Sequence, residues 1–264
     1  MVKSLTLGSY ELAAAADFGP RIISLRRNDS PDFFAHLDPE VGLRQPDGRV
    51  YRLRGGHRLW AAPEIPAVSY APDDHPCEVV ATGDSVRISA PADGAGLEKS
   101  ITVKRHGEEL VVDHRLTNAG SQEIGVAPWA ITQLRLGGVA QLPLRNAEDR
   151  DDLQADRSLV IWPYTNLADS RLSYASDHVL IQGGAGPALK LGSGPEPGAL
   201  SYSLESWRFI KRIEPSLGGP FADRGAVCQV YVKDAFLELE TLGPIALLPP
   251  GAWAEHRETW TITR

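Results

Sequence analysis

The sequence divides almost throughout into short apolar or alternating runs, each bounded by residues that favour turns. Such runs are typical of antiparallel β-strands, because successive side chains of a strand point to opposite faces. Apolar positions at helical spacing are almost absent. We therefore expect strands at residues 4–7, 10–14, 21–26, 77–82, 85–90, 98–105, 109–118, 124–136, 178–182, 189–192, 200–204, 208–213, 226–233, 236–242 and 259–263.

Short polar connections separate several of these runs. We interpret Gly83-Asp84, His106-Gly107, Asn118-Ala119-Gly120 and Lys233-Asp234-Ala235 as hairpin turns. Consecutive hairpins predict a meander, and the whole pattern indicates an all-β sandwich or barrel.

The chain has 264 residues, a length that a single large β domain can fill, and we expect one domain over residues 1–264. Residues 28–54, 60–76 and 146–173 lack a strand pattern and are expected to be irregular. Long irregular segments inside a domain are commonly functional loops. The acidic run Glu148 to Asp152 is interpreted as a solvated loop, with Ca²⁺ coordination as the lesser alternative.

Composition disfavours several classes of function. A formal net charge of -7 argues against nucleic acid or an anionic membrane as partner, so we expect a neutral small molecule. No signal peptide or membrane span is evident, which predicts a cytoplasmic protein. The two cysteines, Cys77 and Cys228, are interpreted as incidental thiols. Scattered histidines and the lack of nucleotide-binding motifs predict neither a metal nor a cofactor.

The segment Gly55-Gly-His-Arg-Leu-Trp-Ala-Ala-Pro-Glu64 carries His57, Arg58, Trp60 and Glu64 close together. Hydrogen-bonding groups beside a flat apolar ring suit a pyranose, which has hydroxyls on its rim and C–H groups on its faces. The alternative is a structural corner, with Trp60 in the core and Arg58 paired to Glu64.

Glu238 and Glu240 alternate with apolar residues and would share one face of a strand. Burial beside apolar residues would raise a carboxyl pKa toward the range of a general base. The alternative is a half-exposed strand with both carboxylates in water. Trp129 and Gln133 also share a face of their predicted strand, and Lys211 lies in another strand that could reach the same pocket.

These segments resemble the galactose mutarotase-like superfamily, the relatives of aldose 1-epimerase, and within it a bacterial subgroup. The resemblance covers nearly the whole chain and implies a single large antiparallel β-supersandwich. The stretches that carry it are Gly19-Pro-Arg-Ile-Ile-Ser-Leu25, residues 55–64, Ala127-Pro-Trp-Ala-Ile-Thr-Gln-Leu134, the Lys211 segment, Phe236 to Pro244, and Leu248-Pro-Pro-Gly251 with His256, Glu258 and Trp260.

The resemblance implies a carbohydrate-binding protein that interconverts sugar anomers by general-base catalysis. Glu240 is similar to the family's late-strand carboxylate, with Glu238 as the second choice. The family's central-strand histidine, which protonates the ring oxygen, has no counterpart beside Trp129 and Gln133. A glutamine cannot take that role near neutral pH.

Two functional hypotheses follow from this departure. In the first, His57 or Lys211 supplies the missing acid, while Arg58, Trp60, Glu64, Trp129 and Gln133 contact the sugar. In the second, the chain is a non-catalytic module that binds or senses a sugar on the same fold. Another reaction on sugars, such as hydrolase or lyase chemistry, is a weaker third.

Overall fold

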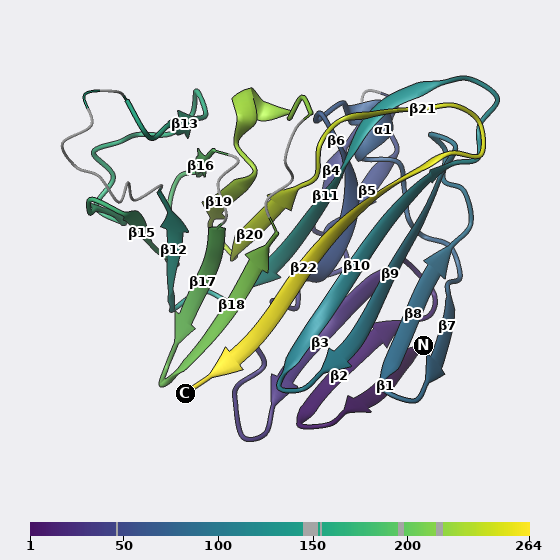
Figure 1. Cartoon of the computed structure of the whole chain (residues 1–264), viewed down its shortest axis with the longest axis horizontal. Helices are drawn as coiled ribbons and strands as arrows, with labels where there is room; N and C mark the ends of the chain where they lie inside the picture. Colours follow the sequence, from purple (N-terminus) through teal and green to yellow (C-terminus); the bar gives the residue numbers. More distant parts are fainter. Residues whose placement is uncertain (46, 145–152, 154, 195–197, 215–218) are drawn as a thin grey trace.

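The computed structural model describes residues 1–45, 47–144, 153, 155–194, 198–214 and 219–264. They form two large antiparallel sheets and one small two-stranded sheet (Figure 1). The first sheet has the order β1 (Val2–Leu7), β2 (Tyr10–Ala15), β3 (Arg21–Arg27), β6 (Gly56–Ala62), β11 (Ile124–Leu134), β20 (Phe236–Leu242), β19 (Cys228–Lys233), β16 (Leu189–Ser193) and β13 (Leu159–Ile161), and β21 (Ala246–Leu248) also pairs with β11.

The second sheet contains the meander. Its order is β14 (Leu172–Tyr174), β15 (His178–Gln182), β12 (Val139–Pro143), β17 (Gly198–Leu204), β18 (Trp207–Ile213), β22 (Trp253–Thr263), β10 (Glu109–Asn118), β9 (Leu97–His106), β8 (Ser85–Ala90) and β7 (Glu78–Thr82). The small sheet pairs β4 (Gly42–Arg44) with β5 (Val50–Arg52). The described part of the chain also contains two short helices, α1 (Pro66–Ser69) and the 3₁₀ turn η1 (Asp223–Gly225).

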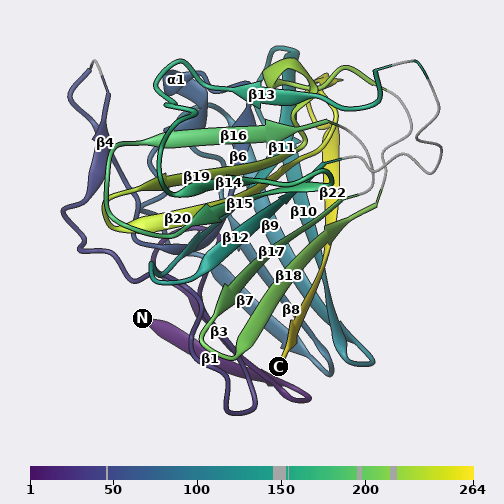
Figure 2. The ribbon, with the colours of Figure 1, turned by 90° about the vertical axis from the view of Figure 1, so that its left-hand side faces the viewer.

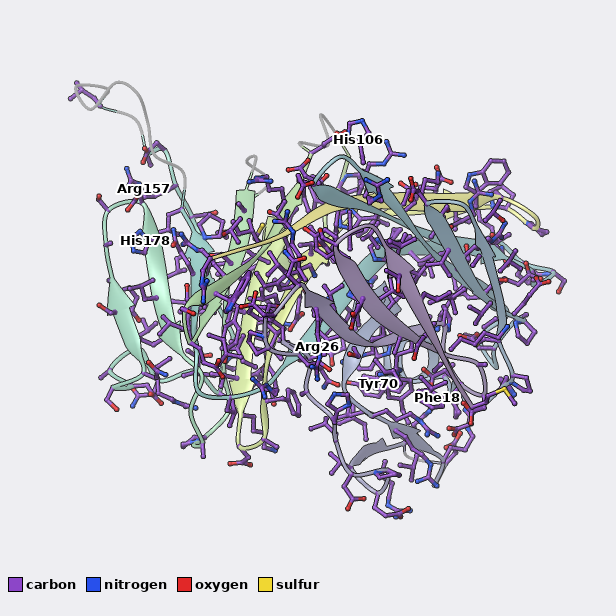
Figure 3. The ribbon with its side chains drawn as sticks, turned by 90° about the horizontal axis from the view of Figure 1, so that it is seen from below. Phe18, Arg26, Tyr70, His106, Arg157 and His178 are labelled. Atoms are coloured by element: carbon purple, nitrogen blue, oxygen red, sulfur yellow. The ribbon has the colours of Figure 1, made fainter. Side chains whose placement is uncertain are left out.

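The main core lies between the two large sheets, where side chains fill the space (Figure 3). β10 shows the expected alternation, with Leu110, Val112 and Leu116 buried and the residues between them partly exposed. On the facing sheet, Leu237 and Leu239 of β20 pack into the same core. The burial of alternate side chains from both sheets is what holds the two layers together.

Three strands of the first sheet are buried on both faces. All residues of β6 and β20 are buried, as are the last nine of β11. One face of these strands packs into the main core, and the other carries a second apolar cluster that includes Trp60, Trp129 and Phe236. Figure 2 shows β16, β19 and β20 running side by side, with β4 beside one end of these strands. This second buried face is where the polar residues predicted for the site gather.

Most of the strands predicted from the sequence are confirmed, including β8 and β10 at the predicted bounds. The meander from β7 to β10 is confirmed by consecutive antiparallel pairing, and so is the β19–β20 hairpin. Among the described residues, no helix reaches the length and apolarity that a membrane crossing requires.

Several predictions were wrong. Asn118-Ala119-Gly120 does not close a hairpin, because β10 pairs with β9 and β22 while β11 belongs to the other sheet. The segments expected to be irregular contain β4, β5, α1 and β13, and β6 was not predicted as a strand. The segment 55–64 has no clear alternation of apolar and polar residues, because both faces of β6 are buried. The acidic run Glu148 to Asp152 lies outside the described residues.

Candidate functional site

A cavity of about 720 Å³ opens on the second buried face of the first sheet. This volume is within the range of sites that hold small molecules. Strands β6, β11, β20 and β16 form its floor, and Tyr70, Tyr164 and the β4 segment contribute to its walls. The residues predicted from the sequence that line it are Arg58, Trp60, Glu64, Trp129, Glu238 and Glu240.

Cross-strand register brings these residues together on the floor. Ile131 of β11 lies between Arg58 of β6 and Glu240 of β20. In the neighbouring row on the same face, Trp129 lies beside Trp60. Residues opposite each other on paired strands are in direct contact, so three segments that are distant in the sequence become one surface.

Arg58 and Glu238 form a buried ion pair across this floor. Arg58 Nη2 donates to Glu238 Oε1 at 2.9 Å, and the guanidinium lies over the Trp60 ring at 4.3 Å from its centroid. The Nε and Nη1 atoms of Arg58 are buried without a hydrogen-bond partner among the described residues. An arginine with spare donors in a cavity is suited to bind ligand oxygens.

Glu240 is almost completely enclosed, with 1% of its surface exposed. Its Oε2 accepts hydrogen bonds from Trp129 Nε1 at 2.8 Å and Lys190 Nζ at 2.7 Å, while Oε1 accepts none from the described residues. Burial raises the pKa of Glu240 to about 7, against the opposing charge of Lys190 and with the help of Glu238. A carboxyl group poised near neutrality can both take up and return a proton.

Lys190 is a cavity residue that the sequence analysis missed. It extends from β16 and its ammonium lies near the rings of Trp129 and Trp162, at 4.8 and 4.7 Å from their centroids. The available signal was a single lysine within the apolar run Ala188-Leu-Lys-Leu191. A buried lysine almost always has a charged partner, but that signal does not identify Glu240 as the partner.

Glu64 and Gln133 occupy different positions. Glu64 lines the cavity and accepts a hydrogen bond from the Tyr70 hydroxyl, whose pKa is raised by burial and by this carboxylate. Gln133 is completely buried beside Glu238 and does not line the cavity. Neither polar atom of its amide has a hydrogen-bond partner among the described residues.

The structure separates His57 and Lys211 from the cavity. Neighbouring residues of a strand point to opposite faces, so Arg58 faces the cavity while His57 faces the main core. Lys211 of β18 reaches that same core from the other sheet. Both side chains are completely buried there.

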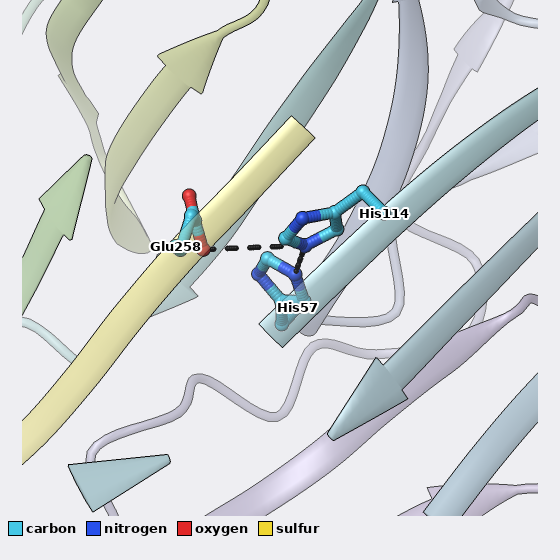
Figure 4. A group of neighbouring side chains, drawn as sticks. All are labelled: His57, His114 and Glu258. Atoms are coloured by element: carbon cyan, nitrogen blue, oxygen red, sulfur yellow. Dashed lines mark hydrogen bonds and ion pairs between the residues drawn. The ribbon is translucent and has the colours of Figure 1, made fainter. Parts of the chain in front are cut away.

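These two residues join a hydrogen-bonded network between the sheets, part of which is drawn in Figure 4. Lys211 Nζ lies 2.9 Å from Glu258 Oε1 and donates to Thr132 Oγ1 at 3.0 Å. Thr132 Oγ1 and His57 Nδ1 are 2.9 Å apart, and His57 Nε2 and His114 Nε2 are 2.7 Å apart.

A single arrangement of protons satisfies this network. His114 Nδ1 donates to the carbonyl oxygen of His256, so His114 Nε2 accepts from His57 Nε2 and His57 Nδ1 accepts from the Thr132 hydroxyl. Burial lowers the pKa of both His57 and His114, which keeps the two rings neutral.

Glu258 carries the negative charge of the network. It also accepts hydrogen bonds from Trp260 Nε1 at 2.7 Å and from the Thr241 hydroxyl. Burial alone would raise its pKa, but the positive charge of Lys211 is the largest of the contributions that outweigh burial and hold it at about 2.

The atoms of His57, His114 and Glu258 that could bind a metal lie within 4.8 Å of one another. A divalent cation there would meet the buried Lys211 ammonium, which already pairs with Glu258. We interpret the group as a structural network, because its donors and acceptors match and its two charges offset each other.

No protein-family model matches the sequence, and no curated protein matches it either. Several solved structures resemble the chain over nearly the whole length of both proteins. A galactose mutarotase-like protein from Lactobacillus casei shares 10% identity at a TM-score of 0.59, and the match covers 100% of both chains. A provisionally named aldose 1-epimerase from Escherichia coli K12 shares 12% identity at a TM-score of 0.61, covering 100% of this chain and 99% of the other.

The chain has the galactose mutarotase-like fold. A third solved structure, a galactose mutarotase related enzyme from Lactobacillus acidophilus, agrees with this at 13% identity and a TM-score of 0.54, covering 100% and 98% of the two chains. Identity this low establishes the fold alone. All seven histidines of this chain are described, and none of them lines the cavity.

Proposed function

We propose that the protein binds a monosaccharide in this cavity and interconverts its anomers, with Glu240 as the general base. The observation that carries the proposal is an enclosed carboxyl group with a pKa of about 7, in a cavity that also holds Trp60 and Arg58. A sugar needs an apolar surface for its C–H face and charged groups for its hydroxyls, and this cavity offers both.

The chemistry assigned to Glu240 is removal of the proton from the anomeric hydroxyl. The ring then opens to the aldehyde, C1 rotates, and the ring closes on the other face. Oε1 accepts no hydrogen bond from the described residues, which leaves it available to the substrate, while the bonds to Trp129 and Lys190 fix Oε2. A fixed carboxylate loses little orientational freedom when it reacts.

A second candidate is a sugar-binding protein without turnover. The observation that favours it is that no histidine lines the cavity, so the usual partner of such a carboxylate is missing. In that case Glu240 would serve only to accept a hydrogen bond from a sugar hydroxyl.

Proton NMR of freshly dissolved α-anomers separates the two candidates. The substrates are D-glucose, D-galactose and their 6-phosphates, each with wild type and with Glu240→Gln. We expect wild type to accelerate anomeric exchange of at least one sugar and Glu240→Gln to lose about 10²- to 10⁴-fold, the usual range for a general base. Saturation transfer without any acceleration by wild type would instead establish the binding protein.

A further inference from the structure

We propose that Lys190 is the general acid that protonates the ring oxygen of the sugar. This inference rests on the proposed anomer interconversion and names the residue that completes it. Its basis is the direct contact, 2.7 Å, between Lys190 Nζ and Glu240 Oε2 inside the cavity.

The reaction requires the acid and the base to be neighbours. The anomeric hydroxyl and the ring oxygen are both bonded to C1, so the group that deprotonates one lies beside the group that protonates the other. Among the described cavity residues, Glu240 accepts hydrogen bonds from Trp129 and Lys190. An indole N–H is far too weak an acid to give up its proton to the ring oxygen, whereas an ammonium can donate a proton and recover it.

Three other proton donors of the cavity, Arg58, Tyr164 and Tyr231, are less suitable. A guanidinium, such as that of Arg58, is a hydrogen-bond donor that does not act as an acid in proteins. Burial raises the pKa of Tyr231 to about 12 and that of Tyr164 further still, which makes both phenols weaker acids. Lys190 is the ammonium that the described structure places in contact with the proposed base.

The position of Lys190 is held by its own main chain and by the rings around it. The Thr165 hydroxyl donates to the Lys190 carbonyl oxygen at 2.8 Å and accepts from the Lys190 amide at 2.9 Å. Trp129 and Trp162 lie near the ammonium. Burying a lysine costs free energy, and these contacts hold the ammonium in a fixed position beside Glu240.

The proton balance closes over one cycle. Glu240 takes the proton of the anomeric hydroxyl, and the electron pair of that O–H bond forms the C1=O bond. The C1–ring oxygen bond breaks, and its electron pair takes a proton from Lys190 Nζ. After rotation about C1–C2, the ring closes by the reverse steps, so Glu240 and Lys190 both regain their starting charges.

The test compares Lys190→Arg and Lys190→Met with wild type in the anomeric exchange assay, alongside sugar binding by saturation transfer. Arginine keeps the positive charge beside Glu240 but cannot give up a proton. We expect both variants to bind sugar and to lose at least about 10²-fold in kcat. Methylammonium added to Lys190→Ala should restore part of the rate.

The matched control is Lys99→Arg. Lys99 is also a buried lysine, paired to Asp93 at 2.7 Å, but it lies on β9, outside the cavity. The Lys99→Arg variant should therefore keep the anomeric exchange rate of wild type. If Lys190→Arg retains a rate within threefold of wild type, the assignment of Lys190 is overturned while anomer interconversion stands. If wild type itself accelerates no sugar, both the proposed function and the role of Lys190 are overturned.

Discussion

Replacing Glu238 by glutamine should lower the pKa of Glu240. The two carboxylates are two residues apart on the cavity face of β20, and the negative charge of Glu238 helps to raise the pKa of Glu240 to about 7. Glutamine keeps the size and polarity of the side chain and removes the charge. In the variant, the positive charge of Arg58 is no longer paired with the Glu238 carboxylate, and this unpaired charge also lowers the pKa of Glu240.

The size of the shift follows from the spacing. Two residues along a strand are separated by about 6.6 Å, at roughly 3.3 Å per residue. Two unit charges at that distance interact by about 2.5 kcal/mol at an effective dielectric constant of about 20. One pKa unit corresponds to about 1.4 kcal/mol, so we expect the pKa of Glu240 to fall by about one to two units.

Carbon-13 NMR of protein labelled at the glutamate side-chain carboxyl measures this pKa directly, without requiring turnover. Glu240→Gln assigns the resonance, and Glu255→Gln, an exposed carboxylate of β22, serves as the control that should leave it unchanged. The pH at which anomeric exchange reaches half its maximum on the acid side should fall with the pKa. A pKa for Glu240 that stays the same or rises in Glu238→Gln would refute this electrostatic account.

Three further results are expected. Glu258→Gln should lower the free energy of unfolding at pH 7 by about 3 kcal/mol, because folding lowers the pKa of Glu258 from 4.5 to about 2. In wild type, this stabilisation is fully present above pH 4.5 and is lost as the pH falls toward 2. His256→Gln should weaken acid destabilisation between pH 6.5 and 3, because burial lowers the pKa of His256 from 6.5 to about 3 and folding keeps it neutral. Trp60→Leu should weaken sugar binding about tenfold, if about 60 Å² of sugar surface is buried at roughly 25 cal/mol per Å².

Urea unfolding measures the first two of these predictions and calorimetric titration measures the third. Glu255→Gln is the stability control and should change the free energy of unfolding by less than about 0.5 kcal/mol, as is usual for exposed carboxylates. Trp253→Leu is the binding control, since Trp253 is exposed on β22. Equal losses in Glu258→Gln and Glu255→Gln, acid destabilisation of His256→Gln as large as that of wild type, or unchanged affinity in Trp60→Leu would each contradict the corresponding argument.

Local pattern was sufficient to predict much of the fold. Strand β10 alternates between core and surface, so its bounds were readable from its residues. Strand β6 was missed for the opposite reason, because both of its faces are buried and its sequence does not alternate. That omission led to His57 and Arg58 being assigned to one pocket, although neighbouring residues of a strand point to opposite faces.

The amino-acid sequence by itself determined the all-β class, most of the strands, and the presence of charged residues in apolar runs, because these depend on neighbours a few positions apart. The tertiary structure alone decided which of those charges meet. Lys190 lies beside Glu240 and Arg58 beside Glu238 because each pair reaches across one intervening strand of the same sheet, β19 for the first and β11 for the second. Such pairing is set by the packing of whole sheets, which local periodicity does not encode.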